Sequence, residues 1–299
     1  MSWFFFAILG YFLYAVVTVS NKFLLRQKAT TRPLVFTFWV GLASLFTFVL
    51  APFGLHWPGW GWFSFDILVG VVYFVALVTY YWALDINEAS RASSLVGGLT
   101  PILVLILTTV FLGDKLNWLQ LAAFFLLVAG GFLISLKMDK GNLKEGMKGL
   151  RFFVLTIILG ALYWVLSKYA YNHQSFITGF TWTRMGLVAS ALAMLLYRPW
   201  RRLIFVSGRQ ASAGLGSLMV GSKIVAGFGS LFVSLALSRG SASLTNALQG
   251  TEYVFLLVLA YIFSKKFPGI MHEKSSPMII AQKIIAVLLI AGGLVILAF

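Results

Sequence analysis

The segment QLAAFFLLVAGG at residues 120–131 returns as QKIIAVLLIAGG at residues 282–293, so in both halves a glutamine is followed, after eight residues, by Ala-Gly-Gly. A weaker echo lies upstream, with the same internal spacing in each half: Ser94, Leu95 and Leu99, then Ser243, Leu244 and Leu248. These matches indicate that the chain contains two copies of one unit.

Apolar runs of about 20 residues, the length of a membrane-spanning helix, recur along the whole chain. We expect an all-α polytopic membrane protein with ten transmembrane helices, five in each copy: 3–25, 33–53, 62–84, 90–112, 117–136, 152–171, 176–197, 212–237, 241–264 and 279–298. A basic segment near residue 145 divides one integrated membrane domain into repeats 1–145 and 146–299. An odd number of spans per repeat inverts the second copy, an arrangement typical of secondary transporters.

Composition supports a membrane protein and excludes an ordinary soluble domain. Hydrophobic residues make up 60% of the 299 residues and charged residues only 10%, against about 25% charged in soluble domains. The formal net charge is +15, but the basic residues lie in short loops between apolar spans, so we expect the lipid bilayer as partner and no nucleic acid. The chain has no cysteine, which excludes disulfides and thiolate metal sites.

The loop charges predict an orientation in the membrane. Alternate loops carry most of the Lys and Arg residues: Arg26, Lys28, Arg32, Arg91, Lys137, Lys140, Lys144, Lys148, Arg151, Arg198, Arg201, Arg202, Arg209, Lys265, Lys266, Lys274 and Lys283. The other loops hold little beyond Lys115 and Arg239. By the positive-inside rule we expect the basic loops in the cytoplasm, both termini outside, and the protein in the inner or plasma membrane of the cell.

Several short motifs resemble the EamA-like repeat of the drug/metabolite transporter superfamily. In the first half they are Trp82-Ala83-Leu84, Arg91-Ala92-Ser93-Ser94-Leu95, Thr100-Pro101, Phe111-Leu112-Gly113-Asp114-Lys115-Leu116 and Ala129-Gly130-Gly131. In the second half they are Ala236-Leu237, Ser241-Ala242-Ser243-Leu244 and Ala291-Gly292-Gly293. The resemblance implies a ten-helix carrier with a central substrate cavity between two five-helix units.

Two features depart from that pattern. Members of the family commonly keep their termini in the cytoplasm, whereas the loop charges here place them outside. Gly250 stands in the second copy where the first has Pro101, and the loop from Lys265 to Pro277 is longer and more polar.

Glu252, near the middle of the predicted span 241–264, is the leading candidate for a functional residue. A charge inside an apolar span costs about 2.5–3.5 kcal/mol on insertion scales, and such residues usually serve a function. Helical spacing places Ser241, Thr245 and Gln249 on the same face as Glu252. The first copy offers a milder stripe of Ser93, Gly97, Thr100 and Thr108. Alternatively, Glu252 is a structural residue, held in one fixed pair.

Four basic residues also lie within predicted spans. Arg184 and Lys223 lie near the middle of their spans, and either could form a stabilising ion pair with Glu252 or face the cavity. Lys22 and Lys168 occupy similar places late in the first span of each copy, so inversion would set them at opposite entrances. The alternative for this second pair is snorkelling from a helix end.

Among the aromatics, Tyr14 shares a face of the first span with Tyr11 and Thr18, and Trp164 shares one of the sixth span with Lys168. Tyr80 recurs with Asp66 and Tyr73 every seven residues along the third span. These side chains could line a cavity, or belong to the core and the interfacial belt.

The sequence favours a secondary active transporter that moves a small solute, such as an amino acid or another carboxylate- or phosphate-bearing metabolite, by alternating access. The basic candidates outnumber Glu252, which could bind a substrate amine or carry a coupling proton; a counter-solute is the other option for coupling. The alternatives are a multidrug or lipid-linked-substrate exporter of the same fold, a membrane subunit that transports nothing, and a membrane-embedded enzyme.

We expect neither catalysis nor a cofactor. His56, His173 and His272 lack metal-ligand spacing, and no Walker-type glycine loop is present. Two repeats of five spans suffice for one site, so we expect a monomer.

Overall fold

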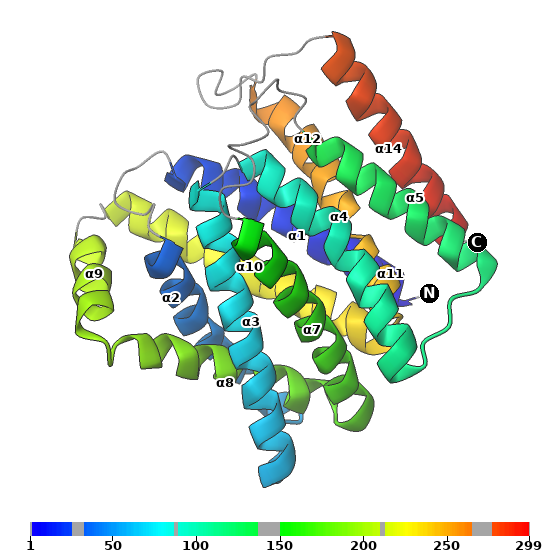
Figure 1. Cartoon of the computed structure of the whole chain (residues 1–299). Helices are drawn as coiled ribbons and strands as arrows, with labels where there is room; N and C mark the ends of the chain where they lie inside the picture. The colour runs from blue at the N-terminus through cyan, green and yellow to red at the C-terminus, as the bar shows by residue number, and fades with distance from the viewer. Residues whose placement is uncertain are drawn as a thin grey trace.

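The computed structural model describes residues 2–25, 33–86, 89–136, 150–209, 213–264 and 277–298, and its elements in these ranges are all helical (Figure 1). In chain order they are α1 (Ser2–Leu25), α2 (Pro33–Ala43), the 3₁₀ segment η1 (Ser44–Phe53), α3 (Trp60–Ile86), α4 (Ala89–Leu107), the π-turn η2 (Thr108–Leu112), α5 (Trp118–Ser135), α7 (Leu150–His173), α8 (Phe176–Met194), α9 (Arg198–Arg209), α10 (Ala213–Arg239), α11 (Ala242–Ala247), α12 (Gly250–Ser264) and α14 (Pro277–Ala298).

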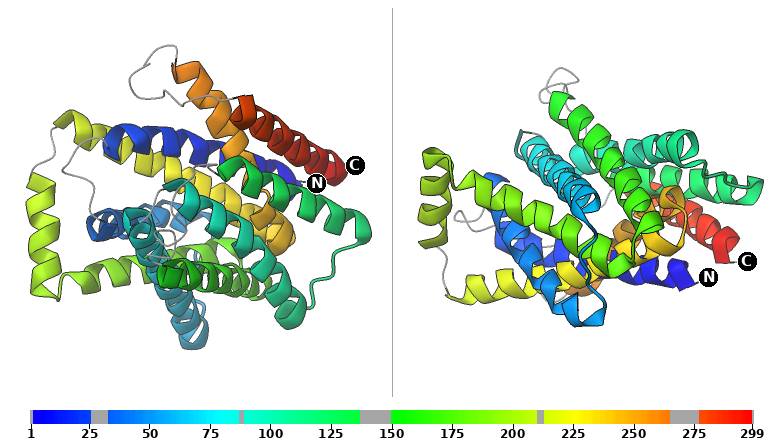
Figure 2. Two further views of the ribbon diagram at one scale, coloured as in Figure 1. Left: turned by 45° about the horizontal axis from the view of Figure 1, so that its top comes forward. Right: turned by 90° about the horizontal axis from the view of Figure 1, so that it is seen from below.

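By length and composition, 8 helices of the described residues can cross a membrane, or 9 when the bent pair α8 and α9 counts as one span. Many of their outward side chains are large and apolar, such as Phe5, Val110 and Leu288, as lipid contact requires. The start of α1 and the end of α14 lie at one end of the bundle, and α9 lies at the other (Figures 1 and 2). A chain that crosses the membrane an even number of times has both termini on the same side.

The expected count of ten spanning helices is not confirmed. The predicted span 241–264 is divided into α11 and α12, each too short to cross alone. Gly250, where α12 starts, packs so closely on α5 that a Cβ there would lie 3.1 Å from the Leu127 carbonyl oxygen. The predicted loop after Tyr197 instead contains α9, bent 99° from α8. The repeat boundary near residue 145 lies outside the described residues.

Helices of the first half pack mainly on helices of the second. α1 packs along α10, and α3 packs correspondingly along α7; α12 packs on α1 as α4 packs on α7 (Figure 2). In the two proposed copies, the contact of α1 with α10 is the counterpart of that of α7 with α3, and the contact of α1 with α12 is the counterpart of that of α7 with α4.

The repeated Ala-Gly-Gly motif lies at the contact between α5 and α14. A Cβ at Gly130 would meet the side chain of Ile290 at 2.6 Å, and a Cβ at Gly293 would meet Leu127 at 2.8 Å. Helices in a bilayer associate through close packing of small residues, because lipid offers apolar side chains as good an environment as a neighbouring helix does. The motif therefore joins the last helices of the two halves.

The tightest helix crossing joins α3 and α8. A Cβ at Gly70 would lie 2.1 Å from the Thr183 carbonyl oxygen, and one at Gly186 would lie 2.4 Å from the Ile67 carbonyl oxygen. Only glycine fits at either position, because the obstructing atoms are backbone and cannot move away as a side chain could.

We predict that Gly70→Ala destabilises the protein by about 1–3 kcal/mol, the usual cost of overpacking a well-packed interface. The measurement is thermal unfolding of purified protein in detergent, with Gly221→Ala as matched control. A Cβ at Gly221 meets nothing within 4 Å, so this exchange in α10 should be neutral or stabilise by up to about 1 kcal/mol through helix propensity. Equal melting temperatures for the two variants would contradict the close crossing.

Candidate functional site

A buried arginine lies where α3, α7, α8 and α10 meet. Arg184 on α8 is only 6% exposed. Its Nη2 donates to the Ser230 hydroxyl on α10 and, at 3.4 Å, to the Tyr163 hydroxyl on α7. Neither partner is charged, and no acidic group pairs with Arg184 among the described residues. The guanidinium has five N–H donors, so most of its donor capacity is left after these two bonds.

Aromatic rings surround the Arg184 guanidinium. Its carbon lies 5.2 Å from the ring centre of Tyr73 and 4.9 Å from that of Phe180. Tyr73 stacks on Tyr163, with ring centres 4.1 Å apart and planes 14° from parallel. Cation–π contacts favour a cation over such faces but do not neutralise it. The site is therefore a buried positive charge surrounded by aromatic rings and hydroxyl groups.

One face of α1 connects this site to Glu252. Tyr14 lies beside Ser230, because a Cβ at Gly229 would meet its ring at 3.1 Å, and its ring centre lies 6.3 Å from that of Tyr11. The Tyr11 hydroxyl donates to the Thr245 carbonyl oxygen at 2.8 Å. One turn further along α1, the Thr18 hydroxyl donates to Glu252 Oε1 at 3.1 Å. The sequence grouping of these three α1 residues on one face is thus matched by their contacts.

Glu252 forms no ion pair with either basic candidate. Its hydrogen-bond partner in the described part of the chain is Thr18, and neither Arg184 nor Lys223 bonds to it. The alternative in which Glu252 is held in a fixed pair with one of these residues is not what the structure shows. Glu252 lies in the first turn of α12, where the helix dipole favours negative charge.

The polar stripe expected on one continuous helix is broken, because α11 ends before α12 starts. Ser241 is the N-cap of α11 and accepts from the Leu244 amide. The Thr245 hydroxyl donates to the Ser241 carbonyl oxygen at 2.7 Å, so it is used within its own helix. Gln249 lies in the turn, with its amide bonded to the Asn246 carbonyl oxygen. Helical spacing therefore does not align these residues with Glu252.

Lys223 contacts an aromatic ring instead of an acid. Its Nζ lies 3.4 Å from the ring centre of Phe36, which belongs to α2. No acidic partner for Lys223 is present in the described ranges. This is the most prominent contact between α10 and α2, which otherwise touch little.

Lys168 has a structural contact that the sequence did not predict. Only 8% exposed, its Nζ donates to the carbonyl oxygens of Leu237, Ser238 and Gly240 at 2.8–3.3 Å. These carbonyls end α10 and lack helical partners, so the ammonium caps that helix. A role for Lys168 at an entrance is therefore poorly matched to its contacts. Its counterpart Lys22 lies on α1, and its side chain is outside the described part.

Gly97 lies against Tyr253 of α12, because a Cβ at Gly97 would meet the Tyr253 hydroxyl at 2.9 Å. Tyr80 lies on α3, with its ring centre 5.6 Å from that of Tyr81. Thr100, one turn after Gly97, is buried and its hydroxyl has no hydrogen-bond partner in the described part. Trp164 packs between two clusters of the core, so its placement is that of a core residue.

Three residues of the arginine site escaped the sequence reasoning. Tyr163, Phe180 and Ser230 are not among the substrate contacts that the sequence predicts. A single aromatic residue in an apolar helix has the same sequence pattern whether its ring stacks on another ring or anchors the helix at the membrane interface. Asp66, grouped with two tyrosines by its spacing, is fully buried, and its carboxylate accepts from Gln174 Nε2 at 2.8 and 3.0 Å.

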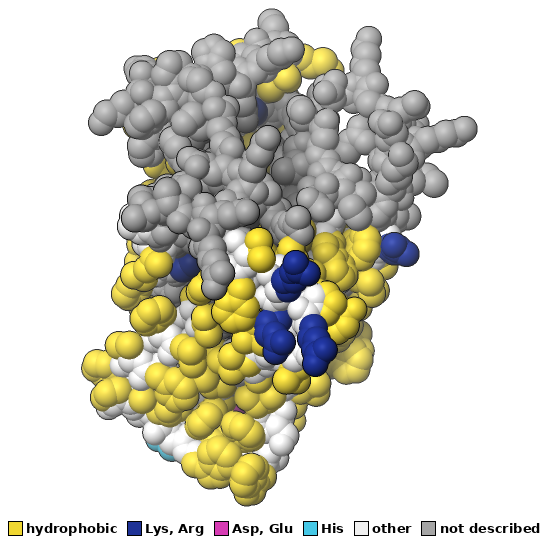
Figure 3. Space-filling view, turned by 90° about the vertical axis from the view of Figure 1, so that its left-hand side faces the viewer, with side chains coloured by type: hydrophobic (Ala, Val, Ile, Leu, Met, Phe, Trp, Pro, Cys, Tyr) yellow, Lys and Arg dark blue, Asp and Glu magenta, His cyan; other side chains and the backbone are white. Residues whose placement is uncertain are grey.

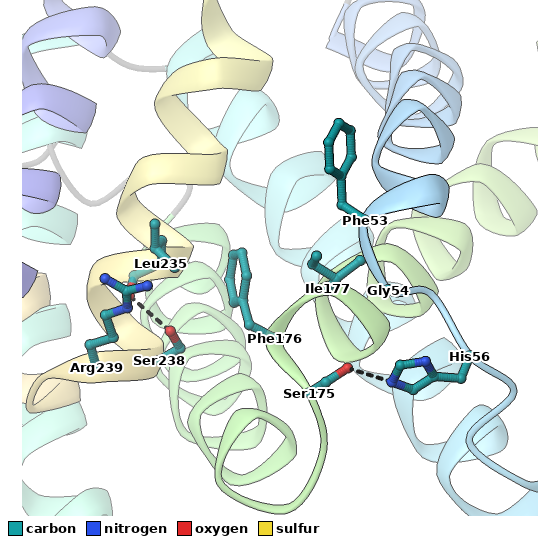
Figure 4. Close-up of a pocket in the computed structure, with 9 residues that line it drawn as sticks. All are labelled: Phe53, Gly54, His56, Ser175, Phe176, Ile177, Leu235, Ser238 and Arg239. Carbon is teal, nitrogen blue, oxygen red and sulfur yellow. Dashed lines mark hydrogen bonds between the residues drawn. The ribbon is translucent and has the colours of Figure 1, made fainter.

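A separate cavity of about 370 Å³ lies where α7 passes into α8, near the end of α10 (Figure 4). Its wall includes Arg239 and His56, whose Nε2 is 3.4 Å from the Ser175 hydroxyl oxygen. None of the residues proposed from the sequence as substrate contacts lines it. The described residues contain no group of three or more His, Cys, Asp or Glu side chains placed to hold a metal ion.

Comparison with known proteins concerns both sequence and fold. No curated protein matches the chain by sequence. A solved structure described as "Crystal structure of protein" superposes with a TM-score of 0.71 at 18% sequence identity, over 99% of this chain and 98% of that chain; at this identity the likeness concerns the fold. The model of the EamA-like transporter family matches residues 1–136. Over these residues the chain is similar to the EamA-like transporter family, and its long apolar helices are those of an integral membrane protein.

Proposed function

We propose that this protein is a secondary active transporter that carries a small metabolite bearing a carboxylate or phosphate group. The observation that carries this proposal is the buried Arg184, whose hydrogen-bond partners in the described ranges are two hydroxyl groups. A buried charge is normally paired, because desolvation without a counter-charge is costly. An anionic group of the substrate supplies that counter-charge when it binds.

The chemistry of the site fits an oxyanion that presents two oxygens side by side. A guanidinium can hold a carboxylate or phosphate through two parallel N–H bonds. The stacked rings of Tyr73 and Tyr163 keep the guanidinium in place, so little side-chain freedom is lost on binding. Lys223 adds a second positive charge on the neighbouring face of α10. This excess of cations makes a hydrophobic cation a poor match for the site.

Glu252 provides the opposite charge at the other end of the α1 face. A substrate with both an anionic group and an amine, such as an amino acid, would satisfy Arg184 and Glu252 together. The same carboxylate could instead carry a coupling proton. The other option is that transport is coupled to a counter-solute exchanged for the substrate. The proposal places these groups between two inverted five-helix repeats, 1–145 and 146–299, in a monomer with cytoplasmic basic loops and outer termini.

Alternating access is supported by two helix contacts that the proposed repeat makes equivalent but that differ in how closely the helices pack. If the halves are inverted repeats, α3 corresponds to α10 and α8 to α2. α3 packs tightly on α8 through Gly70 and Gly186, whereas α10 touches α2 at few points. A transporter that exposes its site to one side at a time must break this symmetry. The opposite state would close α10 on α2.

We predict that Arg184→Met abolishes substrate binding in folded protein. Amino acids, organic acids, sugar phosphates and hydrophobic cations are screened for those that raise the melting temperature of the wild type, as ligands of the native state must. Losing one partner of a buried charge pair costs about 2–5 kcal/mol of binding free energy, or 30-fold or more in affinity. Arg151→Met, at an exposed position, is the control. A folded Arg184→Met protein that still responds to the same solute would exclude Arg184 from the site.

Glu252→Gln tests the second charge. The amide can still accept from Thr18, so we expect near-normal stability. Transport of an amine-bearing or proton-coupled substrate into proteoliposomes should fall by about 10-fold or more, because the negative charge is gone. Thr18→Val, which removes only the hydrogen bond, should reduce transport much less. Early unfolding of Glu252→Gln would instead make this residue structural.

Lys168→Met separates structure from binding. We expect a loss of stability of about 1–3 kcal/mol, because three carbonyl oxygens, one buried and two partly buried, lose their donor. The apparent affinity for the stabilising solute should remain unchanged, as read from the dependence of the melting temperature on its concentration. A Lys168→Met protein of normal stability that no longer binds the solute would instead show that Lys168 contacts the substrate.

A further inference from the structure

α9 is unlike every neighbouring helix in its composition and direction. It follows α8 after a bend of 99°, so it runs roughly parallel to the membrane plane if α8 spans the bilayer. Residues 196–209 contain four arginines and no acidic residue. The inward face of α9 is anchored, because Ile204 is only 2% exposed and packs with Leu203 on a core cluster of α2, α3 and α8.

The outward face of α9 carries positive charge beside apolar surface. Arg198, Arg201 and Arg202 are spaced by three and four residues, so they share a helix face, and all three are exposed. Phe205, 60% exposed, falls on this same face by helical spacing. Tyr197, in the turn before α9, is 55% exposed. Figure 3 shows basic side chains gathered among hydrophobic ones on the side of the molecule that α9 forms.

This combination matches the headgroup region of a bilayer. A helix lying in the membrane interface places arginines among lipid phosphates and aromatic rings among the first acyl carbons. A soluble acidic partner would satisfy the charges, but it would leave Phe205 and Tyr197 without apolar contacts. The loop charges place α9 on the cytoplasmic side, where anionic lipids give the membrane surface its negative potential.

We propose that the face of α9 formed by Arg198, Arg201, Arg202 and Phe205 is a binding surface for anionic phospholipid headgroups of the leaflet next to it. The occupant is defined by charge complementarity: phosphate-bearing headgroups pair with guanidinium groups in a two-bond geometry, and acyl chains cover the aromatic rings. Because α9 connects α8, which bears Arg184, to α10, which bears Lys223, lipid bound there contacts the link between two helices of the candidate site.

The test uses purified full-length protein in nanodiscs of phosphatidylcholine with rising fractions of phosphatidylglycerol. We expect the melting temperature of the wild type to rise with the anionic fraction, and the rise to shrink at high salt. Each basic residue near an anionic surface strengthens association roughly fivefold, so Arg201→Gln/Arg202→Gln should weaken the apparent lipid affinity by about 30-fold. Arg201→Lys/Arg202→Lys keeps the charge and should retain most of the rise.

Lys115→Gln/Arg239→Gln is the charge-matched control, since both residues are exposed near the opposite end of the bundle. It should retain the full rise with phosphatidylglycerol. The proposal is overturned if the α9 double variant keeps the rise, or if the control loses as much as it does, because net charge alone would then explain the effect. It is also overturned if inorganic phosphate in phosphatidylcholine nanodiscs stabilises the wild type equally, since the site would then be one for soluble anions.

A second readout does not depend on stability. The chain has no cysteine, so Val206→Cys introduces a single site for a fluorescent label at an exposed position of α9. Phosphatidylglycerol should shift the label emission to the blue in the wild-type background and not in Arg201→Gln/Arg202→Gln. The same shift in both backgrounds would contradict recognition by these arginines.

Discussion

Close approach between helices of the two halves is the constraint on which the rest of this structure depends. Lipid tails offer apolar side chains as good an environment as a neighbouring helix does, so association in a bilayer relies on contact at short range. Gly70 meets Gly186 at the crossing of α3 and α8, and Gly10 meets Gly229 at the crossing of α1 and α10. Any side chain at these positions would push backbone away from backbone.

The same crossings place the residues of the arginine site. Arg184 precedes Gly186 by two residues on α8, and Tyr73 follows Gly70 by three on α3. On the other pair of helices, Ser230 follows Gly229 directly. The partners of Arg184 are thus positioned by the glycines next to them, and the geometry of the site is a product of helix packing rather than of loops. The alternating access proposed above requires a site of this kind, whose parts belong to both halves.

Much of the architecture could be predicted from the sequence, because apolar length and a repeated motif are local signals. The two Ala-Gly-Gly segments do pack against each other's helices, although Gly130 and Gly293 occupy different places within the motif. Arg184 and Glu252 could be singled out because charges in apolar spans are costly. Their partners could not, because hydroxyls and stacked rings such as Tyr163 resemble any other polar or aromatic residue of a span. The role of Lys168 depends on which side chain lies beside the end of α10. The direction in which Thr245 points depends on the break between α11 and α12, which residue spacing alone does not reveal.

The break between α11 and α12 has a structural consequence. All six residues of α11 are buried, whereas the start of α12 is held to it by short-range bonds, from the Thr251 amide to the Leu248 carbonyl and from the Glu252 amide to the Gln249 carbonyl. Their spacing of three residues replaces the continuous ladder of a straight helix. The break therefore interrupts the helical ladder just before Glu252, while the Tyr11 hydroxyl holds the Thr245 carbonyl oxygen of α11 in the core. Residues 242–264 thus consist of a short buried helix and a separate helix whose first turn carries Glu252.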